Sequence, residues 1–303
     1  HTQYRLIDHA PEGRTEIVSQ MRGNQLADAA KCIVVMVKIG KKDKRYVLAV
    51  VPGDAKLNTN AIKSLYSADY VGFAATEIAE QLKGVYGDRL IVVAVHMVDG
   101  FAAPQAPIGD GLFDTDFRTP AGAAYEQAFS IASLPKGLVS RAPYENAVAL
   151  SRSKWSSAVA AIIDQEADFD LWFDTLSFNA GTNTVTTTVK AVCTKAISGA
   201  HNLTIYLTED SVIDDQLNLE ADPPTVENYV HRHVLRDNVN GTWGEPIITG
   251  SANAGDTLSL SYTYTLSANV LQPANCALVA YISPTTGTEA RVVKQVAEAQ
   301  LVP

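Results

Sequence analysis

Hydrophobic and polar positions follow two different rhythms along this chain, and the change falls near residue 166. Before it, apolar residues recur at helical spacing or form short continuous runs such as KCIVVMVKI and RLIVVAVH. After it, segments such as NTVTTTVKAVCT and TLSLSYTYTL alternate apolar and polar residues with a period of two. Turn-forming clusters, among them NAGTN, ADPPT and SPTTGT, separate these segments. The pattern predicts an α/β region with a mixed sheet, followed by an all-β region that forms an antiparallel β-sandwich.

Up to about residue 84, the sequence predicts short helices around a β-hairpin. KCIVVMVKI and YVLAVVP are expected as two antiparallel strands, because the charged segment GKKDKR between them is typical of a turn. Thr15 is expected to cap a helix, and further helices are expected at residues 60–66 and 76–83. A short strand is expected at residues 70–73.

The segment that follows, up to about residue 165, is expected to continue as an α/β unit. RLIVVAVH is expected as a buried strand. Residues 120–129 and 153–163 are expected as helices, and the first of them opens with a proline suited to the first helical turn. SLPKGLVSR contains a Leu-Pro pair just before an expected strand.

The longest irregular connection, residues 97–119, carries three phenylalanines. Loops of this length are usually functional or mobile. Two readings of Phe101, Phe113 and Phe117 stay open: an apolar recognition surface, or a loop that folds back over the sheet. The tryptophans are expected as core or interface anchors: Trp155, Trp172 and Trp243.

Charge is distributed unevenly over the 303 residues, a length that suits two or three domains. The net charge is −9, but residues 1–90 hold 13 Lys and Arg against 10 Asp and Glu, whereas the remainder holds 11 against 23. This asymmetry predicts that a polyanion would meet the N-terminal part; the alternative is a solvated basic turn. No run of 18 apolar residues is present, so we expect no membrane-spanning helix. The polar opening residues predict no signal peptide.

The N-terminal part carries motifs of one known family. They are the His-Ala-Pro run that starts at His9, Thr15 after it, Lys31 at the start of the first long strand, and the Val-Pro-Gly-Asp run that ends with Gly53 and Asp54. Together they resemble the YbaK family of aminoacyl-tRNA editing domains. The resemblance implies hydrolysis of the ester between a wrong amino acid and transfer RNA, without a metal or another cofactor.

The same resemblance implies a role for each of these residues. Lys31 would be the catalytic cation that places the carbonyl or terminal phosphate of the substrate, and the substrate-binding residues would be His9, Thr15, Gly53 and Asp54. The alternative for Lys31 is a strand residue that faces solvent. The glycine-rich loop that normally completes this family's pocket has no counterpart here. A half domain would therefore complete its sheet with the following segment or with another chain.

A second and longer resemblance covers the chain from about Ala75 to its end. EIAEQLKGVYGDRLIVVAVH, DFRTPAGAAYEQAF, LTIYLTEDSVIDDQ and ENYVHRHVLRDNVNGTWGEPI resemble the Bacteroidetes outer-membrane-protein-28 family of surface lipoproteins. The resemblance implies a thioredoxin-like domain, with a cis peptide bond at Leu134–Pro135, and then an antiparallel β domain that recognises a protein or glycan. GFAATEIAEQL stands where that family usually has a CxxC-like motif. Thiol–disulfide exchange is therefore excluded at that position.

Two histidines suggest a metal site. On a strand, His231 and His233 would share one face and bind zinc; the alternative is a polar sheet face, and no metal is expected. Glu209 and Asp210 would become their neighbours only through folding.

The cysteines are widely spaced and include no CxxC pair, so they encode neither a redox dithiol nor a cysteine zinc site. Cys193 and Cys276 would form a disulfide, or they would be buried small hydrophobic residues.

Taken together, the sequence predicts a chimeric chain of three segments. These are a YbaK-like half domain at residues 1–84, a thioredoxin-like remnant at residues 85–165 and an antiparallel β-sandwich at residues 166–303. The first functional hypothesis is an editing module that hydrolyses mischarged tRNA, fused to a surface-protein-like β domain. The alternative is a non-enzymatic periplasmic or cell-surface binding lipoprotein. The first hypothesis places the protein in the cytoplasm, and the second places it in the periplasm or at the cell surface.

Overall fold

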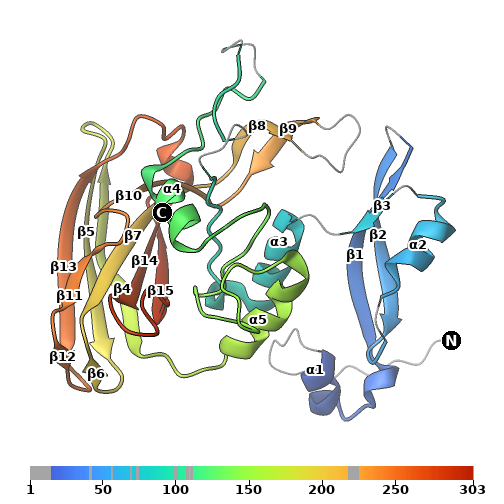
Figure 1. Cartoon of the computed structure of the whole chain (residues 1–303), viewed down its shortest axis with the longest axis horizontal. Helices are drawn as coiled ribbons and strands as arrows, with labels where there is room; N and C mark the ends of the chain where they lie inside the picture. Colours follow the sequence, from blue (N-terminus) through green and yellow to red (C-terminus); the bar gives the residue numbers. More distant parts are fainter. Residues whose placement is uncertain are drawn as a thin grey trace. The chain divides into compact units, whose positions relative to one another are not determined.

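Figure 1 shows the computed structural model of the chain, coloured from blue at the N-terminus to red at the C-terminus. Several short helices lie in the N-terminal half, and a largely antiparallel β region follows, which confirms the coarse prediction. The chain divides into unit 1, residues 1–90 with 218–225, and unit 2, residues 91–217 with 226–303. The structure describes residues 15–40, 43–55, 57–68, 70–72, 75–97, 102–106, 109, 112–217 and 225–302.

Unit 1 contains the predicted hairpin. β1 (Ala30–Ile39) and β2 (Asp43–Pro52) pair antiparallel along their whole length, and β3 (Tyr70–Gly72) pairs with the other edge of β1. β-branched residues favour this extended strand because they pack well on a buried face: Val35 and Val37 are fully buried against Ala68. The remaining elements are α1 (Thr15–Arg22), η1 (Leu26–Asp28), α2 (Thr59–Leu65), α3 (Ala75–Tyr86) and η2 (Gly87–Arg89).

Unit 2 opens with irregular segments and short helices. α4 (Pro120–Ala128) begins where the sequence predicts it, because the Thr119 hydroxyl accepts a hydrogen bond from the Gly122 N–H at 3.0 Å and proline occupies the first turn. η3 (Arg152–Lys154) leads into α5 (Trp155–Ile162). The strands are β4 (Phe169–Asn179), β5 (Thr184–Cys193), β6 (Ile197–Ser198), β7 (His201–Glu209), β8 (Val212–Leu217), β9 (Thr225–His231), β10 (Val234–Asn238), β11 (Glu245–Ile248), β12 (Ser251–Ala252), β13 (Thr257–Thr265), β14 (Cys276–Pro284) and β15 (Gln295–Gln300), with η4 (Pro273–Asn275) before β14.

Two sheets hold most of these strands. The larger has the order β10-β7-β14-β15, with β11 also paired to β7, and the smaller has the order β13-β5-β4. The strand pairs of both sheets are antiparallel. β12 pairs with β6, and β8 pairs with β9. The period-two segments of the sequence are therefore confirmed as antiparallel strands.

The two central strands, β7 and β14, are buried on both faces. On one face Leu203, Ile205 and Leu207 join a core that also contains buried residues of β4 and β5. On the opposite face Tyr206 and Tyr281 pack against Tyr125 of α4. Residues that alternate along a strand point to opposite faces. The β14 sequence CALVAYISP is accordingly an almost continuous apolar run, whereas β7 also buries polar residues such as Thr204 and Glu209.

Two sequence predictions for unit 2 need correction. The segment RLIVVAVH is not a regular strand, because its contact with the sheet is a single parallel bridge between Ala94 and Val234. SLPKGLVSR is followed by no regular strand either; a single bridge joins Gly137 and Leu150. No thioredoxin fold is seen in the described residues of this part, although the Leu134–Pro135 peptide bond is cis as expected.

The membrane prediction concerns helices. Within the described ranges, none of the helices combines the length and the apolar character that crossing a bilayer requires.

α1 begins at Thr15, so this residue is the first of the helix instead of its preceding cap.

Candidate functional site

The residues implied by the YbaK resemblance belong to unit 1. Lys31 is the second residue of β1 and pairs with β2 two residues before Gly53, so their backbones lie at the same end of the hairpin. Asp54 follows in the turn and is exposed, and Thr15 begins α1. His9 lies outside the described residues. The editing role of these residues stays a prediction.

A cluster of tyrosine hydroxyls lies in unit 2, on the face of the larger sheet that α4 covers. β7 contributes Tyr206, and the adjacent β14 contributes Tyr281. The Tyr206 hydroxyl lies 2.9 Å from that of Tyr125 and 3.0 Å from that of Tyr281. The Tyr125 hydroxyl donates to the backbone oxygen of Thr242 at 2.7 Å and accepts from the Asn238 amide at 3.0 Å. These bonds tie α4 to two strands and one turn.

Arg141 reaches into this cluster from the loop after Pro135. Its Nη2 donates to the Tyr206 hydroxyl at 2.5 Å. Its guanidinium carbon lies 4.7 Å from the centre of the Tyr125 ring and 4.9 Å from that of Tyr281, within range of cation–π attraction. Burial lowers the pKa of Arg141, but the neighbouring tyrosine oxygens raise it more, and the net shift is upward. Among the described residues, no carboxylate forms an ion pair with Arg141.

Trp243 closes the cluster from the turn between β10 and β11. Its ring meets Tyr125 edge-on at 5.0 Å, and the guanidinium carbon of Arg291 lies 4.1 Å from its centre. The Asn202 side chain donates to the Trp243 backbone oxygen at 2.9 Å. We call the following set the arginine–aromatic cluster: Tyr125, Phe129, Arg141, Tyr206, Trp243, Tyr281 and Arg291.

The loop that holds Arg141 is pinned to the C-terminal segment. The Val293 N–H donates to the Ser140 backbone oxygen at 2.7 Å, and both Ser140 and Arg141 adopt positive φ angles. This contact places the segments that carry Arg141 and Arg291 side by side. Sequence reasoning missed both arginines, because no local pattern marks residues that meet only through folding.

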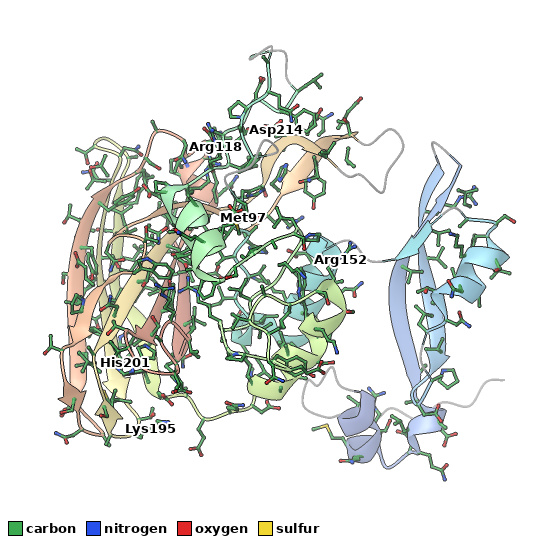
Figure 2. All side chains as sticks on the ribbon, viewed as in Figure 1. Met97, Arg118, Arg152, Lys195, His201 and Asp214 are labelled. Atoms are coloured by element: carbon green, nitrogen blue, oxygen red, sulfur yellow. The ribbon has the colours of Figure 1, made fainter. Side chains whose placement is uncertain are left out.

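A second cluster forms around two histidines. Phe117 stacks on His96 and packs against His231, with ring centres 4.5 Å apart in both cases, and the two histidine rings are 5.8 Å apart. His96 Nδ1 and His231 Nε2 are buried without a hydrogen-bond partner. Burial, helped by His231 and Arg236, lowers the pKa of His96 to about 4. Figure 2 labels Met97, which directly follows His96, and Asp214, whose carboxylate acts on His231.

The predicted histidine pair is not formed. The chain turns at His233, whose φ is +55°, so it does not share a strand face with His231. His233 instead lies 3.3 Å from the Asp210 carboxylate. Within the described part of the chain, no three His, Cys, Asp or Glu side chains are grouped to hold a metal ion.

The core also corrects or settles other predictions. Phe117 is buried, which supports the reading in which the loop folds back, whereas Phe101 lies outside the described residues. Of the two readings of the cysteines, the one as buried small residues is confirmed: Cys193 and Cys276 are both free and buried. Burial raises the pKa of Cys276 to about 12, so its thiol stays protonated.

Comparison with known proteins matches residues 122–301 to the family model described as outer membrane protein Omp28. Among solved structures, HBP35 of Porphyromonas gingivalis is 14% identical, with a TM-score of 0.47 over 60% of this chain and 57% of that chain. Spo0M, a sporulation control protein from Bacillus subtilis, is 11% identical, with a TM-score of 0.26 over 45% and 47%. Chicken MD-1 complexed with lipid IVa is 13% identical, with a TM-score of 0.18 over 44% and 89%.

The comparison with curated proteins gives no match. The matched part of HBP35 makes up 57% of the HBP35 chain, so this chain spans little more than half of that protein. The resemblance to YbaK finds no support in these comparisons, whereas the second resemblance is confirmed over residues 122–301. The matched residues run from the first turn of α4 to the end of β15 and make up more than half of the sequence. The chain belongs to the Omp28 family of outer membrane proteins.

Proposed function

We propose that the protein is a non-enzymatic binding protein of the cell envelope, a periplasmic or cell-surface lipoprotein whose unit 2 binds a ligand. The observation that carries this proposal is the family match over residues 122–301. The matched segment includes every member of the arginine–aromatic cluster and all strands from β4 onward.

The chemistry of unit 2 supports binding. Its tyrosines, arginines and indole offer hydrogen-bond donors and aromatic faces on two strands, a helix and the loops beside them, and such surfaces hold ligands without reacting with them. Burial raises the pKa of Tyr125 to about 12, so its hydroxyl stays neutral and serves as a donor and acceptor. We further propose that the two main sheets form a β-sandwich, since one core draws buried residues from both of them. A thioredoxin-like origin of residues 85–165 remains part of the same proposal.

Envelope location is the property to test. Lys195 is 61% exposed and lies at the edge of unit 2 (Figure 2). Native cells with a permeabilised outer membrane and an intact inner membrane are treated with an amine reagent that cannot cross the inner membrane. We expect labelled Lys195 by mass spectrometry, while a cytoplasmic marker protein stays unlabelled. Labelling of Lys195 only after complete lysis would overturn the proposal.

The editing hypothesis makes a separate prediction. If unit 1 hydrolyses mischarged transfer RNA, purified protein should deacylate it, and Lys31→Ala should abolish this activity. If the protein is a non-enzymatic binding protein, neither the unaltered protein nor Lys31→Ala should hydrolyse mischarged transfer RNA faster than the spontaneous reaction.

A further inference from the structure

Two arginines of unit 2 share one indole ring. The guanidinium carbons of Arg141 and Arg291 lie 5.7 and 4.1 Å from the Trp243 ring, which places them at most about 10 Å apart. Arg291 is exposed, and Arg141 is partly buried among aromatic rings. An anion bound beside the indole would be attracted by both charges.

The described residues do not supply such an anion. The carboxylate nearest to Arg291 along the chain, Glu289, is paired with Lys294 at 2.8 Å. The hydrogen bond from the Arg141 guanidinium goes to the Tyr206 hydroxyl, and the pKa of that hydroxyl is raised well above its usual range by burial. The oxygen is therefore neutral at physiological pH. Moving a guanidinium out of water costs free energy unless an anion pairs with it. A hydrogen bond to a neutral hydroxyl replaces only part of the solvation that water gives the charge.

An anion bound from outside would satisfy both cations. Guanidinium groups present five N–H donors in a fork that matches the oxygens of a carboxylate or phosphate. The exposed position of Arg291 gives access, and the partly exposed Trp243 beside it is suited to the ring of a sugar. A free anion would use the arginines alone, whereas an acidic sugar would also use the Trp243 ring.

We propose that Arg141, Arg291 and Trp243 form a binding site for the oxyanion group of an acidic sugar in the cell envelope. This rests on the proposed envelope function and names its ligand class. The group recognised is a carboxylate or phosphate carried on a sugar ring.

The test is calorimetric titration of the full chain at low salt with glucuronate, glucose 6-phosphate, inorganic phosphate and glucose. We expect saturable binding of at least one acidic sugar, at least tenfold weaker binding of inorganic phosphate, and no binding of glucose. Arg291→Gln should weaken the acidic sugar at least tenfold. Arg232→Gln removes an exposed charge in the turn between β9 and β10 and should change the affinity less than twofold.

Arg141→Lys provides the second arm, since it keeps the charge and removes the fork; it should weaken binding at least tenfold if circular dichroism shows a folded protein. If this variant does not fold, Arg291→Gln decides. No saturable binding of either acidic sugar, or equal affinity of Arg291→Gln and the unaltered protein, would overturn the site. If neither acidic sugar binds but Lys195 is labelled in cells with an intact inner membrane, only the proposed ligand class is wrong. If Lys195 is labelled only after complete lysis, the proposed envelope function is wrong.

Discussion

Glu209 and Arg236 form an ion pair in the interior of unit 2, with Arg236 Nε 3.1 Å from Glu209 Oε2 and both side chains 1% exposed. The pairing of β10 with β7 brings them together. Glu209 also accepts hydrogen bonds from the Leu271 and Gln272 backbone amides at 2.8 and 2.5 Å. Arg236 donates to the Asn269 backbone oxygen. The pair therefore fixes the segment between β13 and β14 as well as the strand edge.

Removing one member of this pair leaves the other charge buried and unpaired. We expect Arg236→Met to lower the free energy of unfolding by about 3–5 kcal/mol, measured by urea denaturation. The double variant Glu209→Leu/Arg236→Met should lose less than the sum of the two single variants, because it leaves no uncompensated charge. A strictly additive double variant would show that the two charges do not stabilise each other.

His96 predicts a pH dependence of stability. Its pKa is lowered from 6.5 to about 4 by burial first, and then by His231 and Arg236. Between these values the unfolded chain binds a proton that the folded protein does not. The free energy of unfolding should therefore fall as the pH is lowered from 6.5 to 4, by up to about 3 kcal/mol from this residue.

His96→Phe keeps a ring that can stack on Phe117 and removes the titration. Urea denaturation at several pH values should give a shallower slope between pH 4 and 6.5 for this variant than for the unaltered protein. His96 would play no part in the acid sensitivity if the two slopes were the same.

Gly244 is required by the close approach of two backbones. Its φ is +71°, and a Cβ there would lie 2.1 Å from the Leu203 backbone oxygen. We expect Gly244→Ala to destabilise the protein by about 2 kcal/mol or more. Gly241 also has a positive φ but open space around it, so Gly241→Ala should cost about 1 kcal/mol. Gly250 has neither a positive φ nor a close neighbour, so Gly250→Ala should leave stability nearly unchanged. Thermal melts in which Gly244→Ala is not the least stable of the three variants would contradict the role given to Gly244.

Tyr206 is the centre of the tyrosine hydrogen bonds. Tyr206→Phe removes the hydroxyl that contacts Arg141, Tyr125 and Tyr281, and we expect a loss of about 1–3 kcal/mol in the free energy of unfolding. Tyr281→Phe removes a hydroxyl with one such contact and should lose less. Equal losses would indicate that the network is not centred on Tyr206.

Much of the β region could be predicted from the sequence, because one solvated face makes polar and apolar residues alternate. β5 is an example: Val185, Val189 and Ala191 are buried, while Thr186 is exposed. The start of α4 was also predictable, since Thr119 and the proline after it are local signals. The strand predicted for RLIVVAVH was wrong. Its apolar residues pack against a hydrophobic cluster, but no neighbouring strand pairs with them along their whole length.

The clusters of unit 2 could not be predicted, because their members meet across long sequence separations. Arg141 and Tyr206 are 65 residues apart, and Glu209 contacts amides more than 60 residues away. The alternation that places His231 and His233 on one face fails at a turn in which His233 itself has a positive φ. No glycine marks that turn in the sequence.

We propose that this protein works in the cell envelope and not as a cytoplasmic enzyme. Its location can be measured by separating native cells into outer membrane, periplasmic, inner membrane and cytoplasmic fractions, with quantitative detection of the protein in each. We expect most of the protein in the outer membrane or periplasmic fraction. Recovery of most of it with the cytoplasmic proteins would show that the proposed envelope function is wrong.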